Sequence, residues 1–248
     1  MSDAWSPGKP DYTALDLPAP PPNRPYVIAN TVMSADGKSV IEGTEQGIGS
    51  AVDQRLMREL RVNADVVLNG AGTLRASGTS SRLGDEALEA IRIERGKPRT
   101  PIAAVVSRGG ELPLERPFFT ARDFPAVIYL SEAAPDERRQ AIEATGRPVV
   151  TLAEGREFSE MLRHMRQELD ADVLLVEGGP TVYAALYALD AVDEAFVTLG
   201  PVVVGGADTL TAVAGEAFTR ETAKRLALLS AHANTETDEV YLRYRVRR

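Results

Sequence analysis

The chain has 248 residues, of which 44% are hydrophobic, so it is long enough for one large domain or two small ones with a substantial buried core. It contains no cysteine, which excludes disulfides, thiol nucleophiles, Cys-ligated zinc and iron–sulfur clusters and fits a reducing, cytoplasmic location. A net charge of −8 and a pI near 5.0 argue against a nucleic-acid or anionic-membrane partner, because those partners require a cationic surface.

The first 24 residues form a proline-rich segment that runs into "LPAPPPNRP". It has no hydrophobic core of the kind found in signal peptides, and no apolar run in the chain approaches the roughly 18 residues of a membrane span. We interpret residues 1–24 as an extended arm that lies along the domain or a partner subunit, or is disordered, and the composition favours disorder.

The first half of the chain alternates predicted strands with predicted helices. "YVIANTVMS" at 26–34 predicts a strand that ends in the turn "ADGKS". A helix is expected from Ser50 to Asn63, where Ser50 is the N-cap, Asp53 completes a variant of the capping box, and Leu56 and Leu60 belong to an apolar stripe. A strand ending at residue 70, a glycine-rich loop around a short helix, and a helix over 85–95 follow.

The second half changes character after residue 190. Strands are predicted at "PIAAVVS", "PAVIYL" and "RPVVTL", with a helix beginning near Pro135 and an amphipathic helix carrying Phe158, Met161, Leu162, Met165 and Leu169. After "ADVLLVEGG" and its helix come three strands without helices between them, "EAFVTLGPVVVGG", "KRLALLSAHA" and "EVYLRYRVRR". This order predicts one α/β domain over residues 25–248, with a mostly parallel sheet covered by helices and antiparallel strands at its C-terminal end.

A strand passes into a helix through Glu177-Gly178-Gly179-Pro180-Thr181. A helix N-terminus carries partial positive charge and unpaired N–H groups, and glycines allow a ligand to approach the backbone, so this turn is suited to hold a phosphate. The carboxyl end of a strand is also where open α/β sheets bind their ligands. The alternative interpretation is a plain strand-to-helix turn.

A second glycine-lined strand end occurs at Gly70-Ala71-Gly72-Thr73. It lacks the third glycine of the dinucleotide fingerprint, since Arg75 stands in that place, and no ribose-binding acid is evident. Thr73 either bonds a phosphate or caps the short helix.

Few other residues suggest chemistry. The two histidines, His164 and His232, form no cluster, and no tetrahedral metal site is expected. Asp36 in the "SADGKS" turn either bonds backbone in the turn or lines a site.

Three segments in order give the chain a family resemblance: "MSADGK", "IGSAVDQRLMRELRVNADVVLNGAGTLRA" and "LLVEGGPTVYAALYALDAVDEAFVTLGPVVVGG". Together they resemble the pyrimidine reductases of riboflavin biosynthesis, the RibD C-terminal domain family, over nearly all of the chain from residue 25. The resemblance implies a dihydrofolate-reductase-like, three-layer α/β/α fold. It also implies transfer of a hydride from NADPH to C1 of a pyrimidine ribosylamine 5′-phosphate, giving a ribityl chain.

The resemblance also assigns residues. The positions that match cofactor-binding positions are Val32, Gly47, Thr73, Ser77, Arg108, Gly178, Gly179, Pro180, Thr181, Val182, Tyr183, Ala184 and Ala185. Those that match substrate positions are Glu45, Arg61, Arg82 and Glu177, with Arg61 at the substrate phosphate. Asp36 and Glu177 are the two acids nominated as catalytic proton donors.

The chain departs from the family in one loop. The usual Ala-Asp-Asp-Pro is replaced around Ser77-Gly78-Thr79, and Arg82 stands two residues early. Glu45 replaces a more usual serine, so either its carboxylate points away from a bound phosphate or the substrate differs. The zinc deaminase of bifunctional members needs cysteines, so a stand-alone reductase is expected.

Two alternatives remain on the same fold, a dihydrofolate or pterin reductase and a nucleotide-binding paralogue without turnover. A homodimer is expected from the apolar late strands, because sheet edges need pairing or protection, and from the resemblance.

Overall fold

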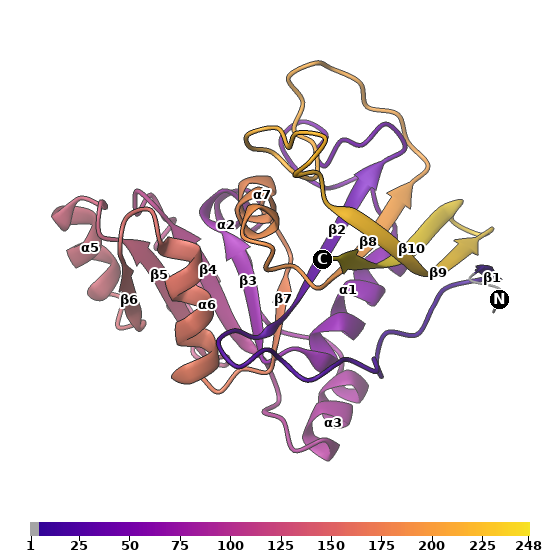
Figure 1. The fold of residues 1–248 in the computed structure, drawn as a ribbon. Coiled ribbons are helices and arrows are strands. Elements are labelled where there is room, and N and C mark those ends of the chain that lie inside the picture. Colours follow the sequence, from indigo (N-terminus) through magenta and orange to yellow (C-terminus); the bar gives the residue numbers. More distant parts are fainter. Residues whose placement is uncertain (1–4) are drawn as a thin grey trace.

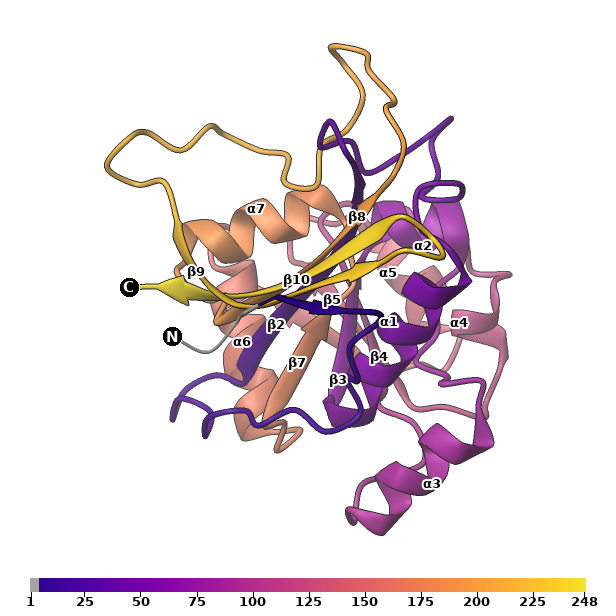
Figure 2. The ribbon, with the colours of Figure 1, turned by 90° about the vertical axis from the view of Figure 1, so that its right-hand side faces the viewer.

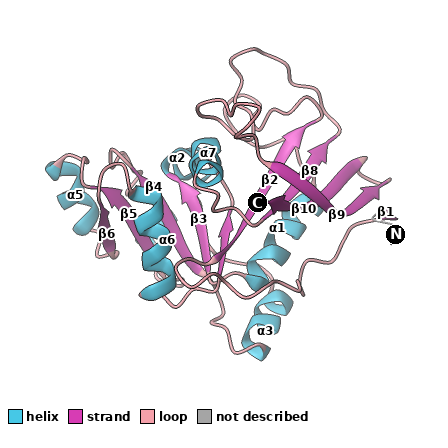
Figure 3. Cartoon of the chain, viewed as in Figure 1, coloured by secondary structure: helices cyan, strands magenta, loops and turns pink. Residues whose placement is uncertain are grey.

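The computed structural model describes residues 5–248, which form one twisted sheet with helices on both faces (Figure 1; Figure 3). The strand order is β1-β9-β10-β8-β2-β7-β3-β4-β5-β6. The strands are β1 Trp5–Pro7, β2 Tyr26–Ser34, β3 Val66–Gly70, β4 Ile102–Ser107, β5 Ala126–Ser131, β6 Val149–Leu152, β7 Val173–Val176, β8 Glu194–Gly200, β9 Arg225–Asn234 and β10 Glu239–Arg247. The helices are α1 Ala51–Asn63, α2 Ala71–Ser77, α3 Glu86–Glu94, α4 Pro117–Thr120, α5 Asp136–Glu143, α6 Glu157–Gln167 and α7 Pro180–Ala188.

The sheet is parallel from β8 to β6 and becomes antiparallel on its C-terminal side. Neighbouring strands from β8 through β2, β7, β3, β4 and β5 to β6 are paired in parallel. Strand β10 is antiparallel to both β8 and β9. The expected mixed sheet with late antiparallel strands is therefore confirmed.

Alternating side chains of the parallel strands pack against helices on both faces of the sheet, which makes the fold three-layered. On one face Val27, Leu68 and Val176 pack with apolar residues of α6 and α7. On the other face Ile28 and Leu175 pack with α1, and the inward residues of β4 and β5 pack with α2, α4 and α5. This is the predicted α/β/α arrangement, and Figure 2 shows α1 and α7 separated by the sheet.

Helix α1 begins as expected but is capped differently. The hydroxyl of Ser50 accepts a hydrogen bond from the Val52 N–H at 3.0 Å. The Ser50 N–H, which a capping box assigns to Asp53, instead donates to Glu239 Oε1 at 2.6 Å, and Ser50 Oγ donates to Glu239 Oε2 at 2.7 Å. The capping-box prediction is therefore wrong, because a carboxylate from β10 takes that place.

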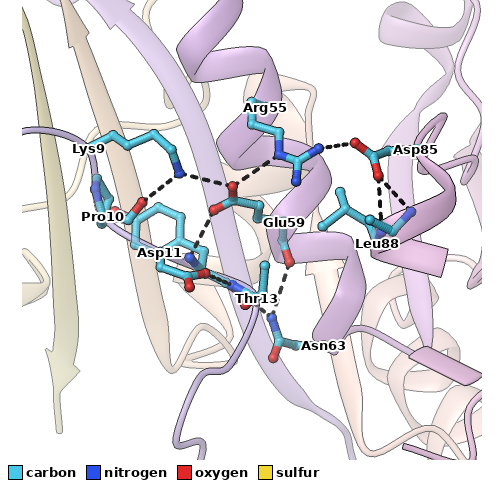
Figure 4. Close-up of polar contacts among 11 residues, drawn as sticks. Lys9, Pro10, Asp11, Thr13, Arg55, Glu59, Asn63, Asp85 and Leu88 are labelled. Atoms are coloured by element: carbon cyan, nitrogen blue, oxygen red, sulfur yellow. Dashed lines mark hydrogen bonds and ion pairs between the residues drawn. The ribbon is translucent and has the colours of Figure 1, made fainter. Parts of the chain in front are cut away.

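The proline-rich arm packs against α1, so the expectation of disorder is wrong for residues 8–24. The Lys9 ammonium lies 3.1 Å from Glu59 Oε1, and the Tyr12 N–H donates to Glu59 Oε2 at 3.0 Å (Figure 4). The Asn63 amide donates to the Tyr12 carbonyl at 2.7 Å and accepts from the Leu15 N–H at 3.2 Å. Two polar residues of α1, one turn apart, thus hold the arm through the Lys9 side chain and through its backbone at Tyr12 and Leu15.

The end of β8 also differs from the sequence prediction. The strand stops at Gly200, and residues 201–224 form a long loop instead of continuing "PVVVGG" as a strand. The Asp36 carboxylate accepts hydrogen bonds from the N–H groups of Val204 and Gly205, at 3.1 and 2.7 Å, so these groups are not available to a neighbouring strand. The loop reaches α7, where the Ala214 N–H donates to the Pro180 carbonyl at 3.1 Å.

Candidate active site

A cavity of about 1150 Å³ opens along the carboxyl ends of the parallel strands. One end is formed by α1 and the loop of residues 39–49, the middle by the starts of α2 and α7, and the other end by the segments that follow β4 and β6. In open parallel sheets this edge is where ligands bind, because loops and helix N-termini from several strands meet there.

The Glu-Gly-Gly-Pro turn lies in the middle of the cavity. Helix α7 starts at Pro180 with Gly179 as its N-cap, and no side chain caps it. The peptide bond between Gly178 and Gly179 is cis. The first turn of α7 therefore lies in the cavity wall without a side-chain cap, which is the arrangement of an anion-binding helix terminus.

Glycines at this point allow two turns of chain to cross closely. The Gly70 N–H donates to the Gly178 carbonyl at 2.9 Å. A Cβ at Gly70 would lie 3.0 Å from a methyl group of Val182, and one at Gly178 would lie 3.0 Å from Thr73 Oγ1. The starts of α2 and α7 therefore lie side by side, and the second glycine-lined strand end belongs to the same cavity as the first.

Thr73 does not cap its helix. The N-cap of α2 is Gly70, and Thr73 lies in the first turn with its hydroxyl against Gly178 and Gly179. Of the two interpretations left open by the sequence, capping is wrong, and Thr73 lines the cavity.

Arg61 and Glu177 form a buried ion pair in the cavity wall. The guanidinium donates to the two carboxylate oxygens at 2.6 and 2.7 Å, and the side chains are 9% and 6% exposed. Arg61 also donates to the Arg82 carbonyl at 2.5 Å. Two residues that are 116 positions apart in sequence are thus brought together in bidentate geometry, the strongest form of this pair.

Glu45 and Ser77 meet at the α1 end of the cavity. The Ser77 hydroxyl donates to Glu45 Oε2 at 3.0 Å, and both residues line the cavity. The Glu45 carboxylate therefore turns toward the end of α2.

Arg108 has a partner that the sequence did not indicate. Its guanidinium lies 2.6 Å from Glu154 Oε1, and the two side chains are 75% and 54% exposed. Both residues line the end of the cavity next to β4 and β6. An arginine and a carboxylate therefore share the position at which a cofactor's adenosine end is expected.

Several nominated residues do not reach the cavity. Asp36 accepts a hydrogen bond from Ser34 Oγ at 2.6 Å in addition to the two from the loop after β8, and these bonds lower its pKa to about 2. Arg82 forms a bidentate pair with Asp123 at 2.6 and 2.7 Å. The residues outside the lining set are Asp36, Gly47, Arg82, Ala184 and Ala185, whereas Val32 and the other nominated positions line the cavity.

One acid of the cavity was missed as a site residue. Asp53 lines the wall together with Met57 and Arg61, which follow at intervals of four along α1. Burial raises the pKa of Asp53 to about 6, against a hydrogen bond with Thr198 that lowers it, and nearby Glu239 raises it further. The helical spacing of Asp53, Met57 and Arg61 was the signal in the sequence, but Asp53 was assigned to the cap.

Residues 5–248 contain neither a metal-ligand cluster nor a membrane-spanning helix. Within this range no three His, Asp or Glu side chains are grouped to hold a metal ion. The helices of the same range are all too short or too polar to cross a bilayer.

Comparison with known proteins identifies relatives over most of the chain. The RibD C-terminal domain family matches residues 25–238. The chain is 30% identical to the 2,5-diamino-6-ribosylamino-4(3H)-pyrimidinone 5′-phosphate reductase of Archaeoglobus fulgidus, over 80% of this chain and 90% of that protein. It is also 30% identical to the reductase of the same name from Methanothermobacter thermautotrophicus, over 90% of this chain and 99% of that protein.

Solved structures agree on the fold. A pyrimidine reductase-like protein from Corynebacterium diphtheriae superposes with a TM-score of 0.80 at 21% identity, covering 91% of this chain and 93% of that one. A bifunctional deaminase and 5-amino-6-(5-phosphoribosylamino)uracil reductase from Thermotoga maritima gives a TM-score of 0.70 at 20% identity, covering 90% of this chain and 57% of that one.

Proposed function

Because the chain belongs to the RibD C-terminal domain family and is a reductase, we propose that it transfers a hydride from NADPH to C1 of the ribosylamino group of a pyrimidine 5′-phosphate in riboflavin biosynthesis. The observation that carries this proposal is the cavity itself. The open N-terminus of α7 and the buried Arg61–Glu177 pair face the same space, so a phosphate-bearing cofactor and a polar acceptor fit side by side.

We assign the cofactor to the middle of the cavity, at the starts of α2 and α7, and to the end formed by the segments after β4 and β6. A Cβ at Gly70 would meet Val182, and one at Gly178 would meet Thr73, so these glycines let the starts of α2 and α7 lie close together at this point. The first turn of α7 and the Thr73 hydroxyl would hold the diphosphate, and Arg108 would contact the 2′-phosphate. When bound, NADPH supplies the hydride, while the protein orients both reactants and excludes water.

We assign the acceptor to the other end of the cavity, which is formed by α1 and the loop of residues 39–49. The named relatives at 30% identity act on 2,5-diamino-6-ribosylamino-4(3H)-pyrimidinone 5′-phosphate, and we take the same acceptor for this chain. Arg61 would donate its remaining N–H groups to the 5′-phosphate, and Glu177 would contact the acceptor. Of the two acids nominated for proton transfer only Glu177 faces the cavity, since Asp36 holds the loop after β8.

The proposal is tested by turnover with three acceptors. NADPH oxidation is followed with the diaminopyrimidinone phosphate, with the corresponding aminouracil phosphate and with dihydrofolate. Reduction of a phosphorylated pyrimidine, with formation of its ribityl product, supports the proposal. Reduction of dihydrofolate alone would indicate a dihydrofolate or pterin reductase. Cofactor binding without turnover of any acceptor would indicate a nucleotide-binding paralogue.

We also infer a homodimer in the cytoplasm. Strands β8 and β10, whose apolar sequences suggested an exposed edge, lie inside the sheet, so the exposed apolar residues near that edge are Leu226 and Leu228 of β9. Strand β1 pairs only with residues 231–233 of β9, which leaves the start of β9 without that partner. A monomer mass by light scattering at micromolar concentration would contradict the dimer.

A further inference from the structure

Asp53 is a carboxylate of the cavity wall to which the proposed reaction gives no task. It lies in the first turn of α1, and its side chain folds over Gly49, where a Cβ would come within 2.5 Å of Oδ2. Both residues line the cavity. The glycine therefore makes room for the carboxylate at this position.

The Asp53 carboxylate makes few contacts within the protein. The cap position that its sequence suggested is taken by Glu239, as described above. Its partner is the side chain of Thr198 on β8, which is 5% exposed. The groups that shift its pKa include no lysine or arginine of the described residues. A half-buried carboxylate with one hydroxyl partner has remaining acceptor capacity, which a ligand in the cavity can use.

The acceptor proposed above carries a matching group. A 2-amino-4(3H)-pyrimidinone presents N3–H beside the exocyclic 2-amino group, so two parallel donors can meet the two oxygens of one carboxylate. The corresponding uracil presents N3–H beside a C2 carbonyl. In that case one carboxylate oxygen faces a carbonyl oxygen instead of a donor, which is repulsive.

We propose that Asp53 is a specificity-determining residue that binds the N3–H and 2-amino edge of the acceptor and selects the 2-amino-pyrimidinone over the uracil. This inference rests on the proposed function, since it assumes that a pyrimidine occupies the α1 side of the cavity. The spacing is consistent with it. Asp53 and Arg61 are eight residues apart on one face of α1, roughly 12 Å along the axis, which leaves room for a ring at Asp53 and a sugar phosphate extending toward Arg61.

Binding of the two ribityl phosphate products tests the inference without turnover. The full chain is saturated with NADP⁺ and titrated calorimetrically with 2,5-diamino-6-ribitylamino-4(3H)-pyrimidinone 5′-phosphate and with 5-amino-6-ribitylaminouracil 5′-phosphate. Wild type is expected to prefer the 2-amino compound by about 10- to 150-fold, the range that one charge-assisted hydrogen bond provides. Asp53→Asn is expected to reduce this ratio to within a few-fold by weakening the 2-amino compound.

Two further variants sharpen the result. Glu59→Gln removes a carboxylate from the face of α1 that contacts the arm, outside the cavity lining, and is expected to keep the wild-type ratio. Thr198→Val keeps the Asp53 carboxylate but removes its hydroxyl partner, and a smaller loss of the ratio is expected.

The outcomes separate this inference from the proposed function. Equal binding of both compounds by wild type, no binding of either, or an equal loss of both in Asp53→Asn would overturn the role of Asp53. If the ratio depends on Asp53 and yet wild type reduces neither acceptor, the inference stands and the proposed reductase activity fails.

Discussion

The Glu177 carboxylate accepts both of its short hydrogen bonds from one guanidinium, that of Arg61, at 2.6 and 2.7 Å. This contact joins the last turn of α1 to the residue that follows β7, and so it fixes the acceptor side of the cavity against the Gly-Gly-Pro turn. Because the pair is buried in the cavity wall, removal of either charge would leave the other without a compensating partner.

Single substitutions in this pair should be more destabilising than removal of both charges. Arg61→Met or Glu177→Met leaves one buried charge unpaired, which costs about 3–5 kcal/mol in the free energy of unfolding. The double variant should recover most of that stability in urea unfolding and remain inactive. A double variant no more stable than either single one would show that the pair is not an electrostatic unit.

Arg61→Ala should also separate acceptor binding from cofactor binding. Loss of the guanidinium is expected to raise KM for the phosphorylated acceptor and to leave NADPH affinity nearly unchanged, because Arg61 lies at the α1 side of the cavity. Steady-state kinetics and direct NADPH titration measure the two effects. If stability falls while KM stays the same, Arg61 has a structural role only.

Glu154 should weaken the preference for NADPH because it pairs with Arg108. Glu154→Gln is expected to increase NADPH affinity several-fold without improving NADH, since the freed guanidinium can bind the 2′-phosphate. Arg108→Ala should reduce the NADPH preference by about ten- to 150-fold, the range of a charge-assisted hydrogen bond. Glu111→Gln is the matched control, because Glu111 lines the same end of the cavity but pairs with Arg138 at 2.8 Å. Equal changes for both cofactors would show that another group reads the 2′-phosphate.

The docked arm should contribute to global stability. Tyr12 is 5% exposed and packs edge-on against Phe196, with ring centroids 4.9 Å apart. Tyr12→Ala is expected to lower the free energy of unfolding by about 3 kcal/mol, as for other buried aromatic residues, and Tyr12→Phe by much less. An unchanged urea midpoint for Tyr12→Ala would mean that the arm does not dock in solution.

Asp53 should reduce stability at neutral pH. Its pKa in the folded protein is about 6, above the value of 3.8 for a free side chain, because burial and Glu239 disfavour the charge. The folded state therefore binds the proton more tightly between pH 4 and 6, and stability falls as the pH rises through this window. Asp53→Asn should be about 2–3 kcal/mol more stable than wild type above pH 7, and the difference should vanish near pH 4. A pH-independent difference in unfolding free energy would contradict this.

The sequence predicted the features that depend on neighbours in the chain. Strand and helix periodicity led to the parallel sheet, and the carboxyl ends of β3 and β7 placed two glycine-rich turns at one cavity. The roles of Glu177, Arg61 and Arg108 came from the family resemblance and not from periodicity.

The misassigned features depend on partners that are distant in sequence. Glu239 takes the cap position from 189 residues away, and Glu59 binds the arm across 47 residues. Asp36 was correctly considered as a residue that bonds backbone, but the backbone is 168 residues away and not in its own turn. Polar residues of this kind carry no local periodicity, so their partners could not be read from spacing.

The most direct test of the central claim is transfer of deuterium from NADPH labelled at C4 of the nicotinamide. The chain is incubated with labelled NADPH and 2,5-diamino-6-ribosylamino-4(3H)-pyrimidinone 5′-phosphate, and the product is analysed by mass spectrometry and NMR. We predict a ribityl product that carries one deuterium at C1 of the side chain. NADPH oxidation with the label absent from that carbon, or no oxidation at all, would contradict the proposed hydride transfer.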